Sequence, residues 1–488
     1  MTAGLAVGLD LGTSGMKAVA LDSSGAVLAR ASASYATSRS EPGASEQDPR
    51  DWIAATVSVA QQIRSATDGA AWAVIGLSGM IPTLVTVDAA LAPIGAAITW
   101  EDSRAETEGD ALRLAIGPCD LYSRTGQWVD GRYLLPMLAR LVRVEPDRLS
   151  ASATLLGAKD FLFAWLTGEL ATDPSTATGF GCFDLAASAW DPAIVATAAE
   201  LAGASLALPE VRPSSSTAPL SGTAAAALGV AAAVPVCLGA ADSVLGAIGM
   251  GCSTPGDIAY VGGTSTIILG VTDAVVLDDQ HRFLVTPMAE PGSYGLEMDL
   301  LATGGAFRWL AGLMGVADEA SLMALAASTS STDRPVFLPY VAPGEQGALW
   351  DPDLTGSITG LHVGHTRADI ARALVDGIVI ESRRCLATLE ENGIDAGQVQ
   401  VSGGSASDPW FRRQLADATG RVVVGTDGGE TDRSAAGAAE VAAASIGWPS
   451  VLAVVDGERS APDPAAAARW AAAADRHETF LAAVRGQA

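Results

Sequence analysis

The first hydrophobic stretches of the chain are short and are separated by turn-forming residues. An apolar run at Leu5–Asp10 enters the turn Gly12–Gly15, and a second run follows at Met16–Asp22. Ser23–Gly25 then leads into a third run, Ala26–Ser34. Short runs bounded by Gly and Ser predict strands joined by tight turns. A P-loop and a dinucleotide-binding turn both need a helix after the loop, so this order excludes both at the first turn.

The middle of the chain repeats this opening pattern. Asp257–Val261 predicts a strand, Gly262–Ser265 a turn and Thr266–Val271 another strand. The tripeptide Gly-Thr-Ser therefore occurs at 12–14 and again at 263–265, each time between two strands. One such tripeptide carries no information, but two in matched positions predict an ancient duplication with two lobes of related fold.

Stretches with apolar residues three and four positions apart predict helices between these strands. Asp48-Pro49 is typical of a helix start, with Asp as N-cap and Pro in the first position. Further helices are predicted at 134–144, 160–167, 243–250, 370–391, 409–419, 435–446 and in an alanine-rich tail from 463. Further strands are predicted at 72–78, 84–88, 234–238 and 399–401. The alternation of strands and helices predicts an α/β protein.

Length and charge limit the function classes. A chain of 488 residues predicts two or three domains. The net charge of -26 argues against nucleic acid and anionic membranes as partners, although a local nest of amides remains able to bind one polyphosphate. The five cysteines form no CxxC pair and the four histidines lack zinc-ligand spacing, so we expect no zinc site and a reducing, cytoplasmic location. We expect no signal peptide and no membrane span.

Asp242 is the only charged residue between Arg212 and Asp257. Taken alone, it favours an N-cap, because Gly239–Ala241 resembles a turn and a helix follows. Its position at the middle of the chain, between the two repeated loops, favours a second interpretation. A carboxylate in apolar surroundings is unfavourable unless it has partners or a catalytic role, so Asp242 is a candidate base at the seam of two lobes.

Three loops are candidates for binding phosphate or nucleotide. Each Gly-Thr-Ser hairpin places amides and hydroxyls on one concave side, which is typical of a phosphate nest but also of an ordinary hairpin. Asp10 ends the strand before the first loop, where it can hold Mg²⁺ through water, and Lys17 is either a counter-charge or a solvated lysine. Ser402-Gly403-Gly404-Ser405 follows a strand and precedes a helix, as a nucleotide loop does.

The complete set of motifs resembles the FGGY family of carbohydrate kinases. The segments that carry the resemblance are GLDLGTSGMKAVALD, WEDSR at Trp100–Arg104, KDFLFAWLTGEL, GAADSVLGAIG, GGTSTI, GSITGLHVGHTRADIARALVDG and SGGSASDPWFRRQLADATG. They follow the family's order over roughly residues 5 to 445, which is nearly the whole chain.

This resemblance implies a two-lobed actin-like ATPase (ribonuclease H-like) fold with duplicated domains, at 1–241 and 242–488, and a central cleft for ATP and sugar. It assigns the ATP phosphates to Gly12, Thr13, Ser14 and Lys17 in the first lobe and to Gly263, Thr264 and Ser265 in the second. Gly403, Gly404 and Ser405 are assigned to the adenosine side. Asp10 is expected to position Mg²⁺, and Asp242 to deprotonate the sugar hydroxyl.

Within the family, the chain is most similar to the xylulokinase-like branch. Trp100, Asp102 and Arg104 match its sugar-contact segment, and Met80 matches the first residue of its Met-His pair. Ile81 stands in place of the histidine and Glu101 in place of asparagine, so xylulose itself stays open beside ribulose, other pentuloses and sugar alcohols. The Arg-Glu pair of glycerol kinases is absent. Without the resemblance, Trp100–Arg104 would also fit a helix start with a surface ion pair.

The sequence therefore predicts an ATP-dependent sugar kinase with ATP and Mg²⁺ as its small-molecule partners beside the sugar. The sequence leaves the oligomeric state open, with a homodimer as one of the alternatives. A chaperone-type ATPase would need a peptide-binding domain where this chain has an alanine-rich tail. A non-catalytic sugar sensor would not need the intact Asp10 and Asp242.

Overall fold

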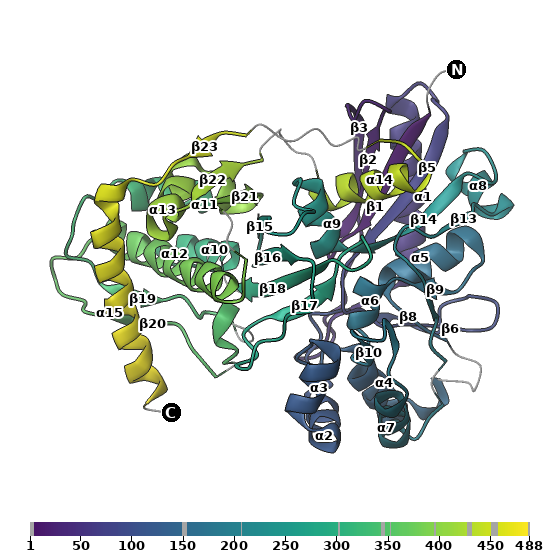
Figure 1. Cartoon of the computed structure of the whole chain (residues 1–488), viewed down its shortest axis with the longest axis horizontal. Coiled ribbons are helices and arrows are strands. Elements are labelled where there is room, and N and C mark those ends of the chain that lie inside the picture. Colours follow the sequence, from purple (N-terminus) through teal and green to yellow (C-terminus); the bar gives the residue numbers. More distant parts are fainter. Residues whose placement is uncertain are drawn as a thin grey trace.

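The computed structural model describes residues 4–148, 154–205, 207–300, 303–342, 347–351, 353–394, 397–426, 432–449 and 457–486. Two large β-sheets, each covered by helices, form two lobes that lie side by side (Figure 1). Four helices extend from the first lobe at the bottom of the view, and these are α2 (Glu106–Ile116), α3 (Pro118–Thr125), α4 (Leu134–Val144) and α7 (Pro192–Ala202).

The first sheet has six strands in the order β13-β14-β5-β1-β2-β3. The strands β1, β2 and β3 form an antiparallel meander, and β5 and β14 add to it in parallel. Their bounds are β1 (Leu5–Leu11), β2 (Gly15–Leu21), β3 (Val27–Ser34), β5 (Trp72–Gly79), β13 (Thr217–Pro219) and β14 (Pro235–Ala241). β1 is buried along its whole length because helices cover both faces of the sheet.

The second sheet repeats this pairing pattern. Its seven strands have the order β17-β18-β16-β15-β21-β22-β23, with β15, β16 and β18 as the antiparallel meander and β21 and β22 added in parallel. Their bounds are β15 (Ile258–Gly262), β16 (Thr266–Thr272), β17 (Leu284–Pro287), β18 (Tyr294–Leu300), β21 (Gln398–Ser402), β22 (Val422–Gly425) and β23 (Arg459–Ser460). The two Gly-Thr-Ser loops connect equivalent strands, so the predicted duplication is confirmed.

Helices cover the two faces of the first sheet. Successive residues of a strand point to opposite faces, so Leu5, Val7 and Leu9 of β1 form one core with α1 (Pro49–Ala66), α5 (Ala158–Thr167) and α8 (Gly222–Leu228). Ala6 faces the other core, formed with α9 (Asp242–Gly249) and α14 (Arg433–Ser445). The second lobe contains α10 (Gly304–Met314), α11 (Glu319–Ala327), α12 (Arg367–Glu391), α13 (Pro409–Thr419) and α15 (Ala467–Arg485).

Small residues allow α14 to lie directly on the first sheet, although it comes late in the sequence (Figure 1). A Cβ atom at Gly8 of β1 would lie 1.8 Å from the carbonyl oxygen of Ala435, and one at Gly76 of β5 would lie 2.0 Å from that of Ala438. Only glycine permits this backbone contact. The chain therefore returns from the second lobe to the first before it ends.

Short strand pairs and one short helix complete the structure. The pairs are β4 (Glu46–Gln47) with β7 (Ala97–Ile98), β6 (Val85–Val87) with β8 (Thr154–Leu156), β9 (Ala171–Thr172) with β12 (Glu210–Val211), β10 (Phe183–Asp184) with β11 (Ala189–Trp190), and β19 (Val336–Leu338) with β20 (Ser357–Thr359); the helix is α6 (Pro174–Thr178). Within the described ranges, no single helix is long and apolar enough to cross a membrane, whereas the bent pair α10 and α11 passes that test by length and composition alone.

One sequence prediction is wrong at the end of β14. Gly239–Ala241 was expected to form a turn, but these residues continue the strand to Ala241. Gly239 has a φ of 71°, and the register of β14 against β5 shifts between Cys237 and Ala240. A glycine with positive φ inside a strand marks a local irregularity, which has the same residue preference as a turn.

Candidate active site

Asp10 lies at the end of β1, next to the first Gly-Thr-Ser loop. Its carboxylate is buried, and Oδ1 accepts a hydrogen bond of 2.6 Å from Ser78 Oγ on β5. Burial, followed by the negative charge of Asp432, raises the pKa of Asp10 to about 7, while Ser78 and Lys17 act in the opposite direction. A carboxylate in this position is stabilised by a nearby cation.

Lys17 on β2 connects this site to the start of α14. Its Nζ lies 2.6 Å from Asp432 Oδ2, and Asp432 Oδ1 caps α14 by accepting a hydrogen bond from the backbone N–H of Ala435. Burial opposes the charged form of Lys17, but Asp432, Asp10 and Asp242 outweigh it and raise the pKa of the lysine. Asp432 was not among the predicted site residues, although its position before the predicted helix at 435 is an N-cap signal.

Asp242 begins α9, the helix that packs between β14 of the first lobe and β15 of the second. Ala241 occupies the N-cap position, so the interpretation of Asp242 as the N-cap is wrong. The carboxylate Oδ1 accepts a hydrogen bond of 2.9 Å from Ser243 N, and the backbone oxygen accepts one of 3.0 Å from Ser434 Oγ of α14. Burial, then the charges of Asp10 and Glu297, raise the pKa of Asp242 well above its usual value.

Glu297 on β18 is a second acidic residue that the sequence analysis missed. It is buried, and its Oε2 accepts hydrogen bonds from Ser243 Oγ at 3.2 Å and Thr286 Oγ1 at 3.1 Å. Burial raises its pKa, and the two hydroxyls lower it. The available signal was a glutamate inside an apolar strand. Glu297, on β18 of the second sheet, therefore forms a hydrogen bond with Ser243, the residue that follows Asp242.

The electrostatics around Asp10 favour a bound cation. Asp10, Asp242, Asp432 and Glu297 are linked by mutual electrostatic repulsion, and Lys17 is the cation that lowers it. Mg²⁺ prefers carboxylate oxygens and keeps several waters. Because a divalent cation offsets the burial and the charge of Asp432 that raise the pKa of Asp10, the carboxylate of Asp10 fits the metal that the sequence assigned to it.

Side chains from three other segments hold the first loop, which is Gly12, Thr13 and Ser14. Gln47 Nε2 donates a hydrogen bond of 2.8 Å to the backbone oxygen of Thr13, and Tyr35 donates to the backbone oxygen of Gly12. The indole Nε1 of Trp100 donates to Thr13 Oγ1 at 3.0 Å. A residue assigned to the sugar by resemblance thus contacts the loop assigned to phosphate.

The second and third loops lie against each other. Gly263 N donates to the backbone oxygen of Ser265 at 2.7 Å, and Arg308 Nη2 donates to Thr264 Oγ1 at 2.8 Å. Gly403 and Gly404, which precede Ser405 in the third loop, have φ angles of 75° and 44°. A Cβ at Gly403 would lie 2.4 Å from the backbone oxygen of Gly262, so the third loop contacts the strand end that enters the second.

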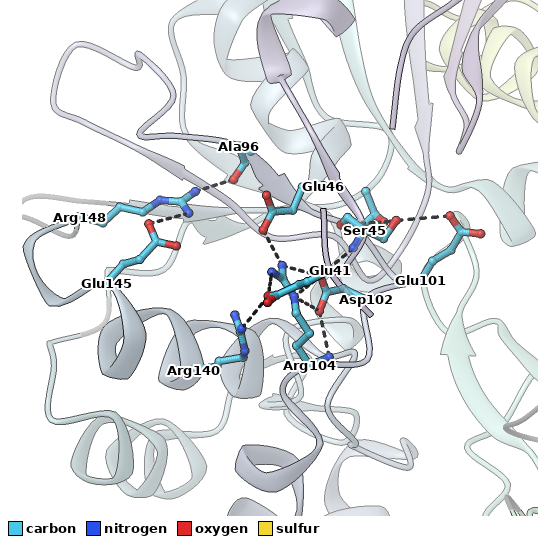
Figure 2. Close-up of polar contacts among 11 residues, drawn as sticks. Glu41, Ser45, Glu46, Ala96, Glu101, Asp102, Arg104, Arg140, Glu145 and Arg148 are labelled. Atoms are coloured by element: carbon cyan, nitrogen blue, oxygen red, sulfur yellow. Dashed lines mark hydrogen bonds and ion pairs between the residues drawn. The ribbon is translucent and has the colours of Figure 1, made fainter. Parts of the chain in front are cut away.

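Asp102 and Arg104 bind each other and the segment before α1 (Figure 2). Asp102 is buried and also accepts a hydrogen bond of 2.9 Å from Ser45 N. The guanidinium of Arg104 pairs with Asp102 at 2.7 Å, with Glu41 at 2.8 Å and with Glu46. Burial opposes the charge of Arg104, but these carboxylates outweigh it and raise its pKa. Both side chains are thus engaged in a structural network.

The remaining residues assigned to the sugar lie in different surroundings. Glu101 pairs with Arg39 at 2.8 Å, and both line a pocket of about 480 Å³. Met80 is buried in the core of the first lobe. Ile81 packs against the cluster that contains residues of β14 and α9, and therefore lies near the helix that begins with Asp242.

A buried network behind Asp242 was also missed by the sequence analysis. Lys159 is fully buried, with Nζ 2.9 Å from Asp160 and 3.1 Å from Asp173. Asp173 accepts a hydrogen bond from Ser175, whose Oγ accepts one of 2.8 Å from the backbone N–H of Ala241. The network thus fixes the residue that precedes Asp242. The sequence signal was one of only two lysines, next to Asp160 at the start of a helix that is otherwise mostly apolar.

One further cluster has the residue types of a metal site. Ligand atoms of Asp333, His362 and His365 lie within 4.8 Å of one another. However, Nδ1 of His362 accepts from Gly364 N at 3.0 Å and Nδ1 of His365 accepts from His362 N at 3.1 Å. Each neutral imidazole then carries its proton on Nε2, where a metal would bind. The hydrogen bonds thus favour a loop-stabilising role.

Two family descriptions match this chain. Residues 5–249 match "FGGY family of carbohydrate kinases, N-terminal domain", and residues 258–446 match the corresponding C-terminal domain. The xylulose kinase of Escherichia coli (strain K12) is 29% identical over 450 residues, which cover 89% of each chain. The glycerol kinase of Gloeobacter violaceus is 30% identical over 431 residues, which cover 86% of this chain and 84% of that one.

The fold comparison gives the same result. The crystal structure of the xylulose kinase from Rhodospirillum rubrum matches with a TM-score of 0.89 and 30% identity, over 98% of this chain and 99% of that one. The similarity therefore extends over both lobes and includes the junction at which Asp10 and Asp242 lie.

Proposed function

The chain belongs to the FGGY family of carbohydrate kinases, and we propose that it transfers the terminal phosphoryl group of ATP to a primary hydroxyl of a ketose such as xylulose. The family membership, the two-lobed actin-like ATPase fold and the kinase activity predicted from the sequence are confirmed. The observation that supports the finer proposal is the position of Asp242, whose basic carboxylate begins α9 at the junction of the two lobes.

In this reaction, Asp242 accepts the proton of the attacking hydroxyl, and its raised pKa increases its basicity. Gly12, Thr13, Ser14 and Lys17 bind the terminal phosphates on one side, and the loops at 263–265 and 403–405 bind the nucleotide on the other. Asp10 would hold Mg²⁺, which would neutralise phosphate charge. Closure of the lobes excludes water, which would otherwise accept the phosphoryl group.

The choice of a ketose rests on the corner at Met80–Ile81 and on Trp100. The similar chains include kinases named for xylulose and for glycerol at nearly equal identity, so family membership alone leaves the sugar open. Trp100 offers an aromatic face for the apolar side of a sugar. Ile81 provides neither a donor nor an acceptor, so a hydroxyl that meets it loses a partner, which costs about 1–3 kcal/mol.

The test is an ATP-coupled assay over the four pentuloses, common hexuloses and sugar alcohols, with Ile81→His measured in parallel. We expect D-xylulose to be a modest substrate, about 10- to 100-fold below a sugar that lacks or inverts the hydroxyl facing Ile81. Ile81→His should raise kcat/KM for D-xylulose. If the wild type already prefers D-xylulose strongly and Ile81→His changes nothing, Ile81 only packs. If no sugar is phosphorylated, the proposed function is wrong.

A further inference from the structure

The indole of Trp100 has two sides with different partners. Its ring is the surface proposed for the sugar, whereas its Nε1 donates a hydrogen bond of 3.0 Å to Thr13 Oγ1 in the first loop. The two residues come from distant parts of the first lobe, since Thr13 joins β1 to β2 and Trp100 follows β7. The side chain of Trp100 therefore directly connects the segment proposed for the sugar to the loop proposed for phosphate.

The chemistry of the two groups gives this contact a direction. An indole nitrogen can only donate, whereas a threonine hydroxyl has one donor proton and two acceptor lone pairs. The bond from Trp100 therefore occupies a lone pair of Thr13 Oγ1 and turns the proton of that hydroxyl away from the indole. A hydroxyl prepared in this way donates to an anionic oxygen such as one of a phosphate.

We propose that Trp100 is a positioning residue for the nucleotide, because its N–H directs the Thr13 hydroxyl toward the terminal phosphate of ATP. This inference rests on the proposed function of the first loop. It also gives one residue a part in both binding sites, so a sugar that packs on the ring immobilises the group that directs Thr13.

The backbone of the first loop is already fixed without Trp100. Gln47 Nε2 bonds to the oxygen of Thr13 and to Thr37 Oγ1, each at 2.8 Å, and Gln47 Oε1 accepts a bond of 2.9 Å from Trp52. Gln47 is buried, so water competes little for these bonds. The backbone of Thr13 is therefore fixed, while its hydroxyl can still rotate, and the hydrogen bond from Trp100 restricts this rotation.

The segment that carries Trp100 is equally rigid. Thr99 N donates to the backbone oxygen of Ser45 at 3.0 Å, and Asp102 accepts from Ser45 N at 2.9 Å (Figure 2). Arg104 then joins Asp102 to Glu41 and to Glu46, which precedes Gln47 (Figure 2). One short stretch, 41–47, thus fixes both the indole and the loop that it contacts. This gives Asp102 and Arg104 a role in holding Trp100.

The test compares the affinity for AMP-PNP, a non-hydrolysable ATP analogue, with that for ADP by calorimetry in the absence of sugar. Trp100→Phe keeps an aromatic ring but loses the N–H, and we expect it to weaken AMP-PNP about two- to twelve-fold, the equivalent of one net hydrogen bond. ADP lacks the terminal phosphate, so its affinity should be unchanged. In steady-state assays the KM for ATP should rise more than the KM for sugar.

Three variants complete the design. Thr13→Val breaks the same bond from the loop side, which keeps the test decisive if Trp100→Phe does not fold. Its effect should not add to that of Trp100→Phe, whereas Thr13→Ser should retain AMP-PNP affinity. Trp190→Phe is the matched control, because the indole of Trp190 donates a comparable bond of 2.8 Å to Pro209 O, away from the loop.

The inference is overturned if Trp100→Phe binds AMP-PNP like the wild type, or if it loses AMP-PNP and ADP affinity equally. A rise in the KM for sugar alone would also overturn it. If the proposed function is wrong, no sugar is phosphorylated. The nucleotide titrations contain no sugar, so they would still show the selective loss of AMP-PNP affinity, and the two failures can be told apart.

Discussion

Single side chains in this protein act through the buried charges around them. Asp242 begins α9 and is repelled by two other carboxylates, those of Asp10 and Glu297, whereas Lys159 lies fully buried between two aspartates. The neighbouring carboxylates disfavour the charged form of Asp242, whereas Asp160 and Asp173 stabilise the charged form of Lys159. A substitution at Asp242 therefore tests catalysis, and a substitution at Lys159 tests the stability of the fold.

Asp242→Asn keeps the shape of the side chain and removes the proton acceptor. We expect turnover to fall by about two to four powers of ten, the usual contribution of a general base, while ATP affinity persists. Steady-state kinetics and nucleotide titration measure the two effects. Asp22→Asn, in the turn between β2 and β3, is the control and should be active. Near-normal turnover of Asp242→Asn would remove Asp242 from the mechanism.

Lys159→Met leaves Asp160 and Asp173 as buried carboxylates without their cation. Removal of one partner from a buried pair costs about 3–5 kcal/mol of the free energy of unfolding. Lys17 is the other lysine of the chain, and its side chain is 50% exposed. Lys17→Met should therefore cost about 1 kcal/mol or less. Denaturant unfolding of both variants gives the comparison, and equal losses would contradict it.

Among the secondary-structure elements, α12 shows how local chemistry sets a boundary. Its N-cap, Thr366, and Asp369 form a capping box, and Thr329 Oγ1 donates a further bond of 2.7 Å to Asp369. These hydrogen bonds, first from Thr329 and then from Thr366, lower the pKa of Asp369 to about 2. The charged carboxylate is thus the form that holds the start of the helix.

Asp369→Asn should lower the free energy of unfolding by about 0.5–2 kcal/mol at pH 7. Because the pKa of Asp369 is lower in the folded state, its charged carboxylate stabilises the folded state at pH values above 3.8, the pKa in the unfolded state. This contribution to the free energy of unfolding is lost as the pH falls toward 2. The difference between wild type and variant should therefore shrink below pH 4. Thermal melts at pH 7 and pH 3 test this, and a constant difference would show that the charge plays no part.

At the scale of the whole molecule, α14 brings the chain from the second lobe back to the first. It belongs to the proposed second domain, 242–488, yet it packs on β1 and β5 of the first sheet and on α9. A Cβ at Gly437 would lie 2.0 Å from the backbone oxygen of Leu245 in α9. The helix that begins with Asp242 is thus positioned by an element from the far end of the chain.

Gly437→Ala should force α14 away from α9. We expect a loss of about 1–3 kcal/mol in unfolding free energy, as for other overpacked contacts, together with reduced turnover because Asp242 moves. Gly312→Ala in α10 is the matched control, since nothing lies within 4 Å of its Cβ, and it should stabilise by about 0.5–1 kcal/mol. Full activity and stability of Gly437→Ala would show that α14 can shift freely.

The sequence by itself determined the strand–loop–strand openings, the duplication, the family and the position of Asp242. Helices 134–144 and 409–419 have the predicted bounds. These features follow from apolar periodicity and turn residues, which act between near neighbours in the chain. Gly239 was misjudged for the same reason, because a glycine with positive φ has the same local signal in a turn and in a strand irregularity.

The tertiary structure alone decided which polar side chains meet. Lys17 and Asp432 are 415 positions apart, Ser243 and Glu297 are 54 apart, and Thr13 and Trp100 are 87 apart. Local pattern shows that each of these residues lies at the end of an element or within one, but not which element packs against it. The packing partner of each element is decided when the two sheets and α14 bury their apolar faces together. The hydrophobic effect does not favour one apolar partner over another, so the close contact of small residues selects which elements pack together.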